Sequence, residues 1–465
     1  MRIRPASRLR GRVQVPGDKS ISHRAAIIAA LARGRTEITN FSTSADCAST
    51  LEVIGALGVP VERDGATVRV EGAGMDEGPP RFRRPSQPLD CGNSGTTMRL
   101  VAGVLAAQPF DSVLTGDDSL NRRPMLRIVQ PLGFMGARVS TVEGHAPLRV
   151  EGRWPLEAIS YEMPVASAQV KSCVLLAGLG ADGHTQVVEP NGQTRNHTER
   201  MLAWFGAEVN TKSLMRMGVL HPWDFRFSVM LEGPSRLRAR DVSVPGDFSS
   251  AAFLVAAAAM LRGSVLELDG VGLNPTRTHL LRLLKGLGAY LKVDFASVEE
   301  EGEPVGSIRV RGARELVPDP EYFPSVAGWG PNGETGSNVV RGHAVAKMID
   351  ELPVLAVLAT QVRGGLEIRD ARELRVKESD RIRAVAENLR AMDADVVELY
   401  DGLRIYGPTR LHGARLQSFG DHRIAMTFAV AALAAEGESE IVGAEECVPV
   451  SFPEFFPVLE SLAER

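Results

Sequence analysis

The chain has 465 residues, too many for one ordinary hydrophobic core, so we expect two or more domains. Hydrophobic residues make up 44% of the sequence and charged residues 24%, which is typical of a globular protein and not of a disordered or fibrous one. The 53 basic and 57 acidic residues give a formal net charge of −4, which argues against nucleic acid as a partner.

The cysteines and the apolar runs exclude further classes. The four cysteines are far apart and form no C-x-x-C pair, so we expect no metal site and no disulfide framework. No apolar run approaches the roughly 18 residues that span a bilayer. The basic start, MRIRPASRLRGRVQVPG, lacks the apolar segment of a signal peptide. We therefore expect a cytoplasmic protein that does not bind membranes.

Taken in chain order, six helix-like segments are apolar on nearly every side. Such helices are expected to be buried within a layer of other structure. The segments are HRAAIIAALA, TTMRLVAGVLA, AQVKSCVLLAGL, SSAAFLVAAAAM, DELPVLAVLAT and DHRIAMTFAVAALAA.

A second element follows five of these segments. It is a helix-like stretch that stops at a glycine or aspartate and opens a short β-rich run, as in TLEVIGALGVPVE. The stop residues, 70 to 105 positions apart, are Gly58, Gly136, Gly206, Gly288 and Asp393. The repetition predicts an α/β fold of six units, the last one truncated. An ordinary βαβ array with a parallel sheet is the alternative.

The pattern VPGDKS at Val15 returns as VPGDFS at Val244. We interpret these as the two points where the chain passes from one domain to the other. Residues 18–243 then form one domain with three units. Residues 1–17 and 244–465 form the second domain with the other three.

Small and basic residues gather at the starts of the buried helices, in GDKSISHR, GNSGTTMR, SAQVK and GDHR, and in the nearby segments NRRP, TRNHTER and RVKESDR. Helix N-termini favour anions, and lysine and arginine add charge-assisted hydrogen bonds. A single arginine could equally be a solvated surface cation. Repeated at six equivalent ends, these residues predict ligands that carry phosphate and carboxylate groups.

Two carboxylates accompany these cations. Asp350 precedes a buried helix and could simply cap it. Glu378 could be an (i, i+3) ion-pair partner of Arg381. Both could also exchange protons with a substrate, and the residues alone do not separate these interpretations.

Seven motifs together resemble the EPSP synthase family: VPGDKSISHRAAIIAAL, GNSGTTMRL, GDDSLNRRPM, SAQVKSCVLLAGL, NPTRT, RVKESDRI and FGDHRIAM. The likeness covers nearly the whole chain. It implies a two-domain inside-out α/β barrel built from six βαβ-type repeats, with buried helices and outward sheets. Substrates would bind in a cleft that closes around them.

The resemblance also implies binding roles, position by position. Those for shikimate 3-phosphate are Lys19, Ser20, Arg24, Ser167, Gln169, Arg195, Asp350 and Lys377. Those for phosphoenolpyruvate are Lys19, Gly95, Arg123, Gln169, Arg381 and Arg423. The bulkier mimic glyphosate would share the second set.

The implied reaction transfers the enolpyruvyl group of phosphoenolpyruvate to the 5-hydroxyl of shikimate 3-phosphate, for aromatic amino acid biosynthesis. Asp350 would accept the hydroxyl proton, and Glu378 or Lys19 would deliver a proton to the methylene carbon. A tetrahedral adduct would then lose phosphate. We expect no cofactor and no metal, only small-molecule partners, and a monomer.

Some positions depart from the family pattern. Asn196 stands where many members have aspartate, and Ala168 where some have a second serine. Val450 stands where some have a lysine that contacts phosphoenolpyruvate, so we assign no role there. Leu214 to Phe227 and Pro318 to Gly336 are interpreted as insertions.

Two other functions remain open at this point. The sister enzyme that acts on UDP-N-acetylglucosamine shares the fold and chemistry, but usually has a loop cysteine that GDDSLNRRP lacks. A non-catalytic anion-binding repeat protein is the second alternative. The presence of Lys19, Asp350, Glu378 and Arg381 together argues against it.

Overall fold

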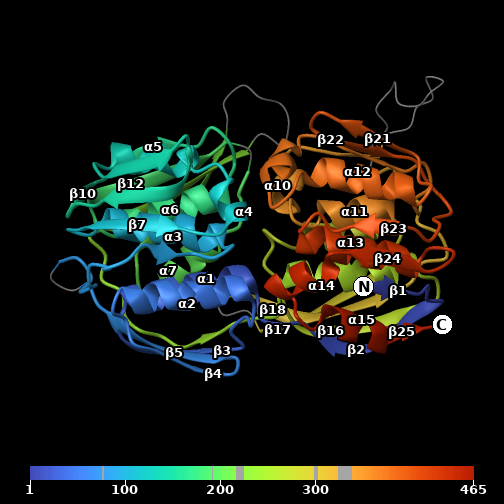
Figure 1. The fold of residues 1–465 in the computed structure, drawn as a ribbon, viewed down its shortest axis with the longest axis horizontal. Helices are drawn as coiled ribbons and strands as arrows, with labels where there is room; N and C mark the ends of the chain where they lie inside the picture. Colours follow the sequence, from blue (N-terminus) through green and yellow to red (C-terminus); the bar gives the residue numbers. More distant parts are fainter. Residues whose placement is uncertain (76–77, 191, 216–224, 298–301, 323–337) are drawn as a thin grey trace. The chain divides into compact units, whose positions relative to one another are not determined.

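The computed structural model describes residues 1–75, 78–190, 192–215, 225–297, 302–322 and 338–465. The chain divides into two compact units, coloured mainly orange-red and blue-green in Figure 1. Unit 1 comprises Met1–Pro16, Gly246–Val298 and Pro304–Arg465; unit 2 comprises Gly17–Pro245 and Glu299–Glu303. The chain passes from unit 1 to unit 2 after Pro16 and returns to unit 1 after Pro245. Both points fall inside the repeated VPGD pattern.

Unit 2 contains three successive repeats, each with a buried helix followed by an outer one. The buried helices are α1 (Lys19–Leu31), α3 (Gly95–Ala106) and α6 (Ala168–Gly178). The outer helices are α2 (Ala45–Ala56), α5 (Leu126–Phe134) and α7 (His197–Trp204), with the one-turn α4 (Asp118–Asn121) before α5. Helix α3 packs against α1 and α6, so apolar faces on all sides of these helices are covered.

The sheets of unit 2 share one plan. A short edge strand runs parallel to the strand that leaves the buried helix, and two antiparallel strands complete the sheet. The strand orders are β15-β3-β5-β4, β6-β7-β9-β8 and β10-β12-β14-β13, with β11 also on β12. The strands are β3 (Arg33–Thr39), β4 (Val61–Asp64), β5 (Thr67–Ala73), β6 (Leu89–Asp90), β7 (Asp111–Thr115), β8 (Arg138–Val142), β9 (His145–Glu151), β10 (Leu156–Glu157), β11 (Ser160–Glu162), β12 (Ala181–Glu189), β13 (Val209–Met215), β14 (Phe225–Gly233) and β15 (Val242–Ser243).

Unit 1 repeats this arrangement. Its buried helices are α8 (Phe248–Met260), α11 (Leu352–Ala359) and α13 (His422–Leu433). Around them lie α9 (His279–Gly286), α10 (His343–Lys347), η1 (Arg372–Val376), α12 (Arg381–Ala391), α14 (Ala444–Cys447), η2 (Val448–Val450) and α15 (Phe455–Leu462). Figure 1 shows α11 and α13 inside this unit, with β21 and β22 at one edge and β16 and β2 at the opposite edge.

The sheets of unit 1 have the orders β17-β18-β16-β2-β25, β19-β20-β22-β21 and β1-β24-β23. The last has only three strands, as expected for a truncated sixth repeat. The strands are β1 (Arg2–Ile3), β2 (Arg8–Gln14), β16 (Val265–Gly272), β17 (Tyr290–Ser297), β18 (Val305–Arg311), β19 (Val339–Val340), β20 (Leu366–Ile368), β21 (Val396–Leu399), β22 (Gly402–Ile405), β23 (Arg415–Gln417), β24 (Ser439–Val442) and β25 (Ala463–Glu464).

This architecture confirms the predicted α/β class of six repeats with buried helices and outward sheets. The alternative of one parallel sheet is wrong, because the described strands form six separate sheets with mostly antiparallel pairing. Each unit has its own hydrophobic core, built around its three buried helices. None of the described helices is long and apolar enough to cross a membrane.

The predicted helix stops are also confirmed. All five stop residues follow the C-terminus of an outer helix and have φ between 62° and 94°, the left-handed region that favours glycine. At the first of them, the N–H of Val59 returns to the carbonyl of Ile54, which closes the helix end. The two suspected insertions lie partly outside the described residues, at 216–224 and 323–337.

Candidate active site

About half of the predicted site residues lie in the first turn of a helix or cap it, and these are Lys19, Ser20, Gly95, Ser167, Gln169, Arg381 and Arg423. In five of the six buried helices, the N-cap side chain accepts a hydrogen bond from a backbone N–H of the first turn, and these caps are Asp18, Ser94, Ser167, Asp247 and Asp421. The remaining N–H groups and the helix dipole give each end a positive character.

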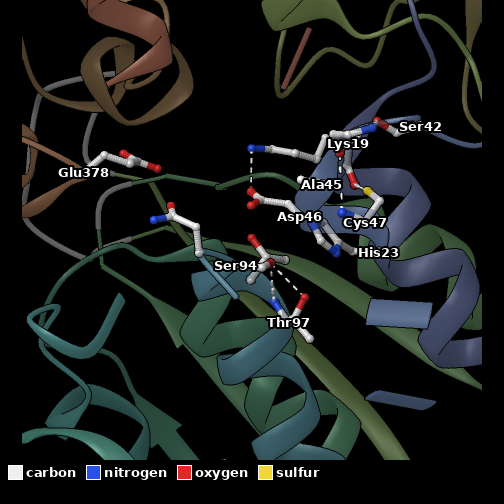
Figure 2. Close-up of polar contacts among 12 residues, drawn as sticks. Lys19, His23, Ser42, Ala45, Asp46, Cys47, Ser94, Thr97 and Glu378 are labelled. Carbon is white, nitrogen blue, oxygen red and sulfur yellow. Dashed lines mark hydrogen bonds and ion pairs between the residues drawn. The ribbon is translucent and has the colours of Figure 1, made fainter. Parts of the chain in front are cut away.

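In unit 2, Lys19 is the first residue of α1. Its Nζ lies 2.9 Å from Oδ2 of Asp46, near the start of α2, as Figure 2 shows. The Lys19 side chain is 15% exposed and that of Asp46 11%. The cation assigned to both substrates is therefore held by a carboxylate that the sequence did not single out.

Arg24 lies one turn further along α1 and is 3% exposed. It donates from Nε to Thr198 on α7 (2.7 Å), from one terminal nitrogen to Ser172 on α6 (2.8 Å), and from the other to the carbonyl of Ser20 (2.9 Å). These bonds join three helices of unit 2 through one guanidinium. They also fix the backbone of Ser20, a predicted substrate contact.

Gly95 opens α3 beneath two arginines. A Cβ at this position would lie 2.8 Å from a terminal nitrogen of Arg99 and 3.4 Å from one of Arg123. Arg99 donates to Gln169 Oε1 at 2.8 Å, and Arg123 donates to Asn93 at 2.6 Å. The structure thus brings Gly95, Arg123 and Gln169 into one cluster, as the resemblance implied, and adds Arg99 to it.

Two further predicted contacts belong to unit 2. Ser167 caps α6 by accepting from the N–H of Val170 at 3.4 Å. Arg195 is half-buried, two residues before α7. Asn196, where the family often has aspartate, is the N-cap of α7, and its side chain makes no capping hydrogen bond.

In unit 1, Arg381 organises the predicted residues. It is the first residue of α12 and 1% exposed, with Nε 2.8 Å from Asp421 Oδ2 and terminal nitrogens 2.6 Å from Glu378 Oε2 and 3.3 Å from Asp350 Oδ1. Burial alone would lower the pKa of Arg381, but the three carboxylates outweigh it and raise that pKa above its usual range. The guanidinium is therefore permanently charged.

Asp350 also lies close to the two other predicted cations of unit 1. Asp350 Oδ1 lies 3.9 Å from Lys377 Nζ and 3.8 Å from Arg423 Nε. Burial lowers the pKa of Lys377, and Asp350 opposes that shift. All five predicted residues of unit 1 thus form one network around Arg381 and Asp350.

One interpretation of Asp350 is wrong. The N-cap of α11 is Glu351, and its side chain makes no capping hydrogen bond. Asp350 instead faces cations. The ion-pair interpretation of Glu378 is confirmed by the 2.6 Å contact with Arg381, which is compatible with a role in proton transfer as well.

Sequence reasoning missed Asp46 and Asp421 and gave no role to Arg99. Asp421 accepts from Ser379 and Arg381 and caps α13, and its place in FGDHRIAM just before a buried helix was the available signal. Arg99 follows Gly95 by one helical turn, which also could have indicated it. Asp46 belongs to no quoted motif, so only the fold reveals its pairing with Lys19.

Taken together, these groups define an enzyme class that handles multiply charged anions and moves protons. Buried guanidinium and ammonium groups at helix N-termini suit phosphate and carboxylate. Asp350 and Glu378, held against one cation, suit acid–base work.

Comparison with known proteins narrows this class. The model of the EPSP synthase (3-phosphoshikimate 1-carboxyvinyltransferase) family matches residues 3–459. The chain is 49% identical to the 3-phosphoshikimate 1-carboxyvinyltransferase of Koribacter versatilis, covering 100% of this chain and 99% of the relative. It is 45% identical to that of Desulforamulus reducens, over 99% of this chain and 98% of the relative. The chain therefore belongs to the EPSP synthase family.

A solved structure agrees with this assignment. The EPSP synthase of Acinetobacter baumannii at 2.37 Å superposes with a TM-score of 0.80 at 38% sequence identity, covering 99% of this chain and 98% of that one.

Proposed function

We infer that the chain transfers the enolpyruvyl group of phosphoenolpyruvate to the 5-hydroxyl of shikimate 3-phosphate. Phosphate leaves by addition and elimination through a tetrahedral intermediate, in the pathway to the aromatic amino acids. The observation that carries this function is the network of Asp350, Glu378 and Arg381 in a chain that matches the EPSP synthase family over almost its whole length.

Roles for the acidic residues follow from their contacts. Asp350 accepts the proton of the 5-hydroxyl, and its contacts with Arg381 and Lys377 hold its carboxylate in place for this role. Glu378 or Lys19 delivers a proton to the methylene carbon of phosphoenolpyruvate. Arg381 touches both carboxylates, so their titrations are coupled and a pH profile reports the group as a whole.

The remaining predicted residues bind the substrates. For shikimate 3-phosphate we propose Lys19, Ser20, Arg24, Ser167, Gln169, Arg195, Asp350 and Lys377. For phosphoenolpyruvate we propose Lys19, Gly95, Arg123, Gln169, Arg381 and Arg423. The division follows the family resemblance, and the position of several of these residues at helix N-termini supports a role in binding anions. Preorganised donors of this kind stabilise anionic states without reorganising.

A phosphate-release assay tests the function. Purified protein should release inorganic phosphate only when phosphoenolpyruvate and shikimate 3-phosphate are both present. Replacing shikimate 3-phosphate by UDP-N-acetylglucosamine should give no release, and turnover with that acceptor instead would assign the sister reaction. No release with any acceptor would leave an anion-binding protein.

We propose that the protein acts as a cytoplasmic monomer and needs no further partner for this reaction. Light scattering after size-exclusion chromatography should then give the mass of one chain, 50.1 kDa.

A further inference from the structure

Asp46 has no role in the function proposed so far, yet its carboxylate lies directly beside Lys19, a proposed substrate-binding residue. Its Oδ2 lies 2.9 Å from the ammonium of Lys19, and both side chains are largely buried (Figure 2). Lys19 on α1 and Asp46 on α2 are 27 residues apart in sequence, so the fold alone creates this pair.

The two helices place these charges unequally. Lys19 is the first residue of α1, where the positive end of the helix disfavours a cation. Asp46 is in the first turn of α2, where the same effect favours a carboxylate. The carboxylate of Asp46 therefore offsets an unfavourable location for the Lys19 ammonium.

Several described titratable groups of unit 2 lie near Lys19. On α1 these are Asp18, His23 and Arg24, and on α2 they are Asp46 and Cys47. Burial and the charge of Lys19 lower the pKa of His23, and burial raises the pKa of Cys47 to about 12, so both are neutral near pH 7.

Other described groups of unit 2 close to the pair of Lys19 and Asp46 are a helix cap and hydroxyl groups. Oδ1 of Asp18 accepts the N–H of Ile21 as a helix cap. The neighbouring helices α3 and α7 contribute hydroxyl groups, Thr97 towards Thr50 of α2 and Thr198 towards Arg24 of α1.

The second oxygen of Asp46 gives independent evidence. The whole residue Asp46 is 8% exposed. Its Oδ1 is buried and has no hydrogen-bond partner among the described residues. A buried acceptor without a donor costs stability, and such atoms in native proteins call for an explanation. The buried Oδ1 makes this carboxylate costly for stability. The cost is explained if the contact between Oδ2 and the ammonium of Lys19 serves the function.

We propose that Asp46 is the positioning residue for Lys19. It fixes the direction of the ammonium group and keeps it protonated up to the pH at which Lys19 acts on the substrates. Asp46 touches Lys19 and works through it. This inference rests on the proposed function, because it assigns Lys19 a part in the reaction.

The test compares Asp46→Asn with the wild type in the phosphate-release assay from pH 6 to pH 10. The asparagine keeps the size but removes the charge. We expect kcat to fall about 10- to 100-fold, less than the loss expected for a proton donor itself. The alkaline limb of the pH–rate profile should move down by about one pH unit or more, because an ammonium without its carboxylate loses its proton more easily.

A double-mutant cycle with Lys19→Met makes the test specific. If Asp46 acts through Lys19, adding Asp46→Asn to Lys19→Met should lower kcat by less than 2-fold further. A matched control is Glu37→Gln, which breaks the 2.7 Å pair with Arg69 on the outer sheet of the same unit and should leave the profile in place. The melting temperature of each variant separates a structural effect from a functional one.

The outcomes separate the two proposals. Wild-type protein that releases no phosphate overturns the proposed function, whatever Asp46 does. Active wild type with an unmoved alkaline limb in Asp46→Asn overturns this inference and leaves the function standing. A lower melting temperature with an unchanged pH profile would give Asp46 a structural role only.

Discussion

Arg381 shows how much of this site depends on one side chain. It is 1% exposed and contacts Asp350, Glu378 and Asp421, so both proposed acid–base carboxylates take their orientation from the same guanidinium. A lysine could not replace it, because the planar fork of arginine is needed to reach several carboxylates at fixed angles.

Glu378 provides the most direct test at this scale. Glu378→Gln keeps the size and can still accept a hydrogen bond from Arg381, but it removes the titratable proton. If Glu378 is an acid–base group, turnover should fall about 10²–10⁴-fold while both substrates still bind. Steady-state kinetics and calorimetric binding measure the two quantities. Near-normal turnover would reduce Glu378 to an ion-pair residue, and Glu387→Gln on the exposed side of α12 is the control.

Gly95 tests the phosphoenolpyruvate assignment. In Gly95→Ala the new methyl meets Arg99 at 2.8 Å and crowds Arg123, so the guanidinium that orients Gln169 must shift. The wild type should be inhibited by glyphosate in competition with phosphoenolpyruvate, and the variant should show roughly 5- to 150-fold weaker inhibition, from a clash of about 1–3 kcal/mol. Phosphoenolpyruvate itself should lose less affinity.

The Gly95→Ala variant has a matched control in the same unit. Gly133→Ala in α5 places its methyl where no atom lies within 4 Å, so inhibition should not change. Unchanged inhibition in Gly95→Ala, with weaker shikimate 3-phosphate binding, would move Gly95 to the other substrate.

At the scale of elements, Lys171 links helix α6 to strand β12 and helix α7 through two ion pairs. This residue of α6 is fully buried and lies 3.1 Å from Glu189 of β12 and 2.7 Å from Glu199 of α7. Burial raises the pKa of Glu199, and Lys171 opposes that rise. Burial would lower the pKa of Lys171, but both glutamates raise it overall.

Lys171→Met should therefore destabilise the protein. Removing one partner of a buried pair costs about 3–5 kcal/mol, because two buried carboxylates lose their cation. Glu199, whose pKa burial already raises, then lacks the cation that opposes this shift, so the loss should be full at neutral pH and shrink as pH falls and Glu199 takes up a proton. Urea unfolding at several pH values measures this, with Lys212→Met on the exposed face of β13 as control. A loss that does not vary with pH would contradict the argument.

The contact between α9 and α10 should make the fold acid-sensitive. The rings of His279 and His343 pack edge to face at 5.7 Å between centroids. Burial, with the nearby charges of His343, Lys347 and Arg282, lowers the pKa of His279 to about 4, and the pKa of His343 is also lowered. Between about pH 6.5 and 4 the unfolded chain therefore binds protons that the native protein does not.

Stability should consequently fall as pH decreases through that window and vary little above it. The denaturation midpoint of His279→Gln should fall less steeply with acid than that of the wild type. His184→Gln, on an exposed position of β12, should retain the wild-type slope. Equal slopes in wild type and His279→Gln would show that this histidine does not titrate as described.

The sequence predicted the repeated elements well because each has a local cause. Apolar residues on all sides required buried helices, and five positions needed a left-handed residue to end a helix. The seven motifs led to the family, and in unit 1 the residues they named do meet in one network. Asp46 could not be predicted, because its partner lies on another helix and no local pattern links them. The parallel edge strands were also missed, since two-residue strands have no periodicity to detect.

At the scale of the whole molecule, the two units differ in continuity. All of unit 2 except Glu299–Glu303 lies in the unbroken segment Gly17–Pro245, whereas unit 1 joins three segments. Residues 17–245 expressed alone should therefore fold and unfold cooperatively in urea. The fragment should be less stable than in the full chain, because His197 loses Glu303 at 2.7 Å and Arg200 loses the carbonyl of Gly302. Circular dichroism that shows no cooperative transition would contradict this.

The pairing of β2 with β16 has a consequence for synthesis on the ribosome. Strand β2 leaves the ribosome well before β16, its neighbour in the sheet, which lies about 250 positions later in the chain. At 5–20 residues per second it waits roughly 10–50 s for its neighbour. Residues 17–245, which are all of unit 2 except Glu299–Glu303, emerge during that delay and can fold. Six of the seven residues of β2 are exposed or half-buried even in the finished sheet, and four of the seven are arginine or glutamine, so the waiting strand offers little apolar surface to other nascent chains.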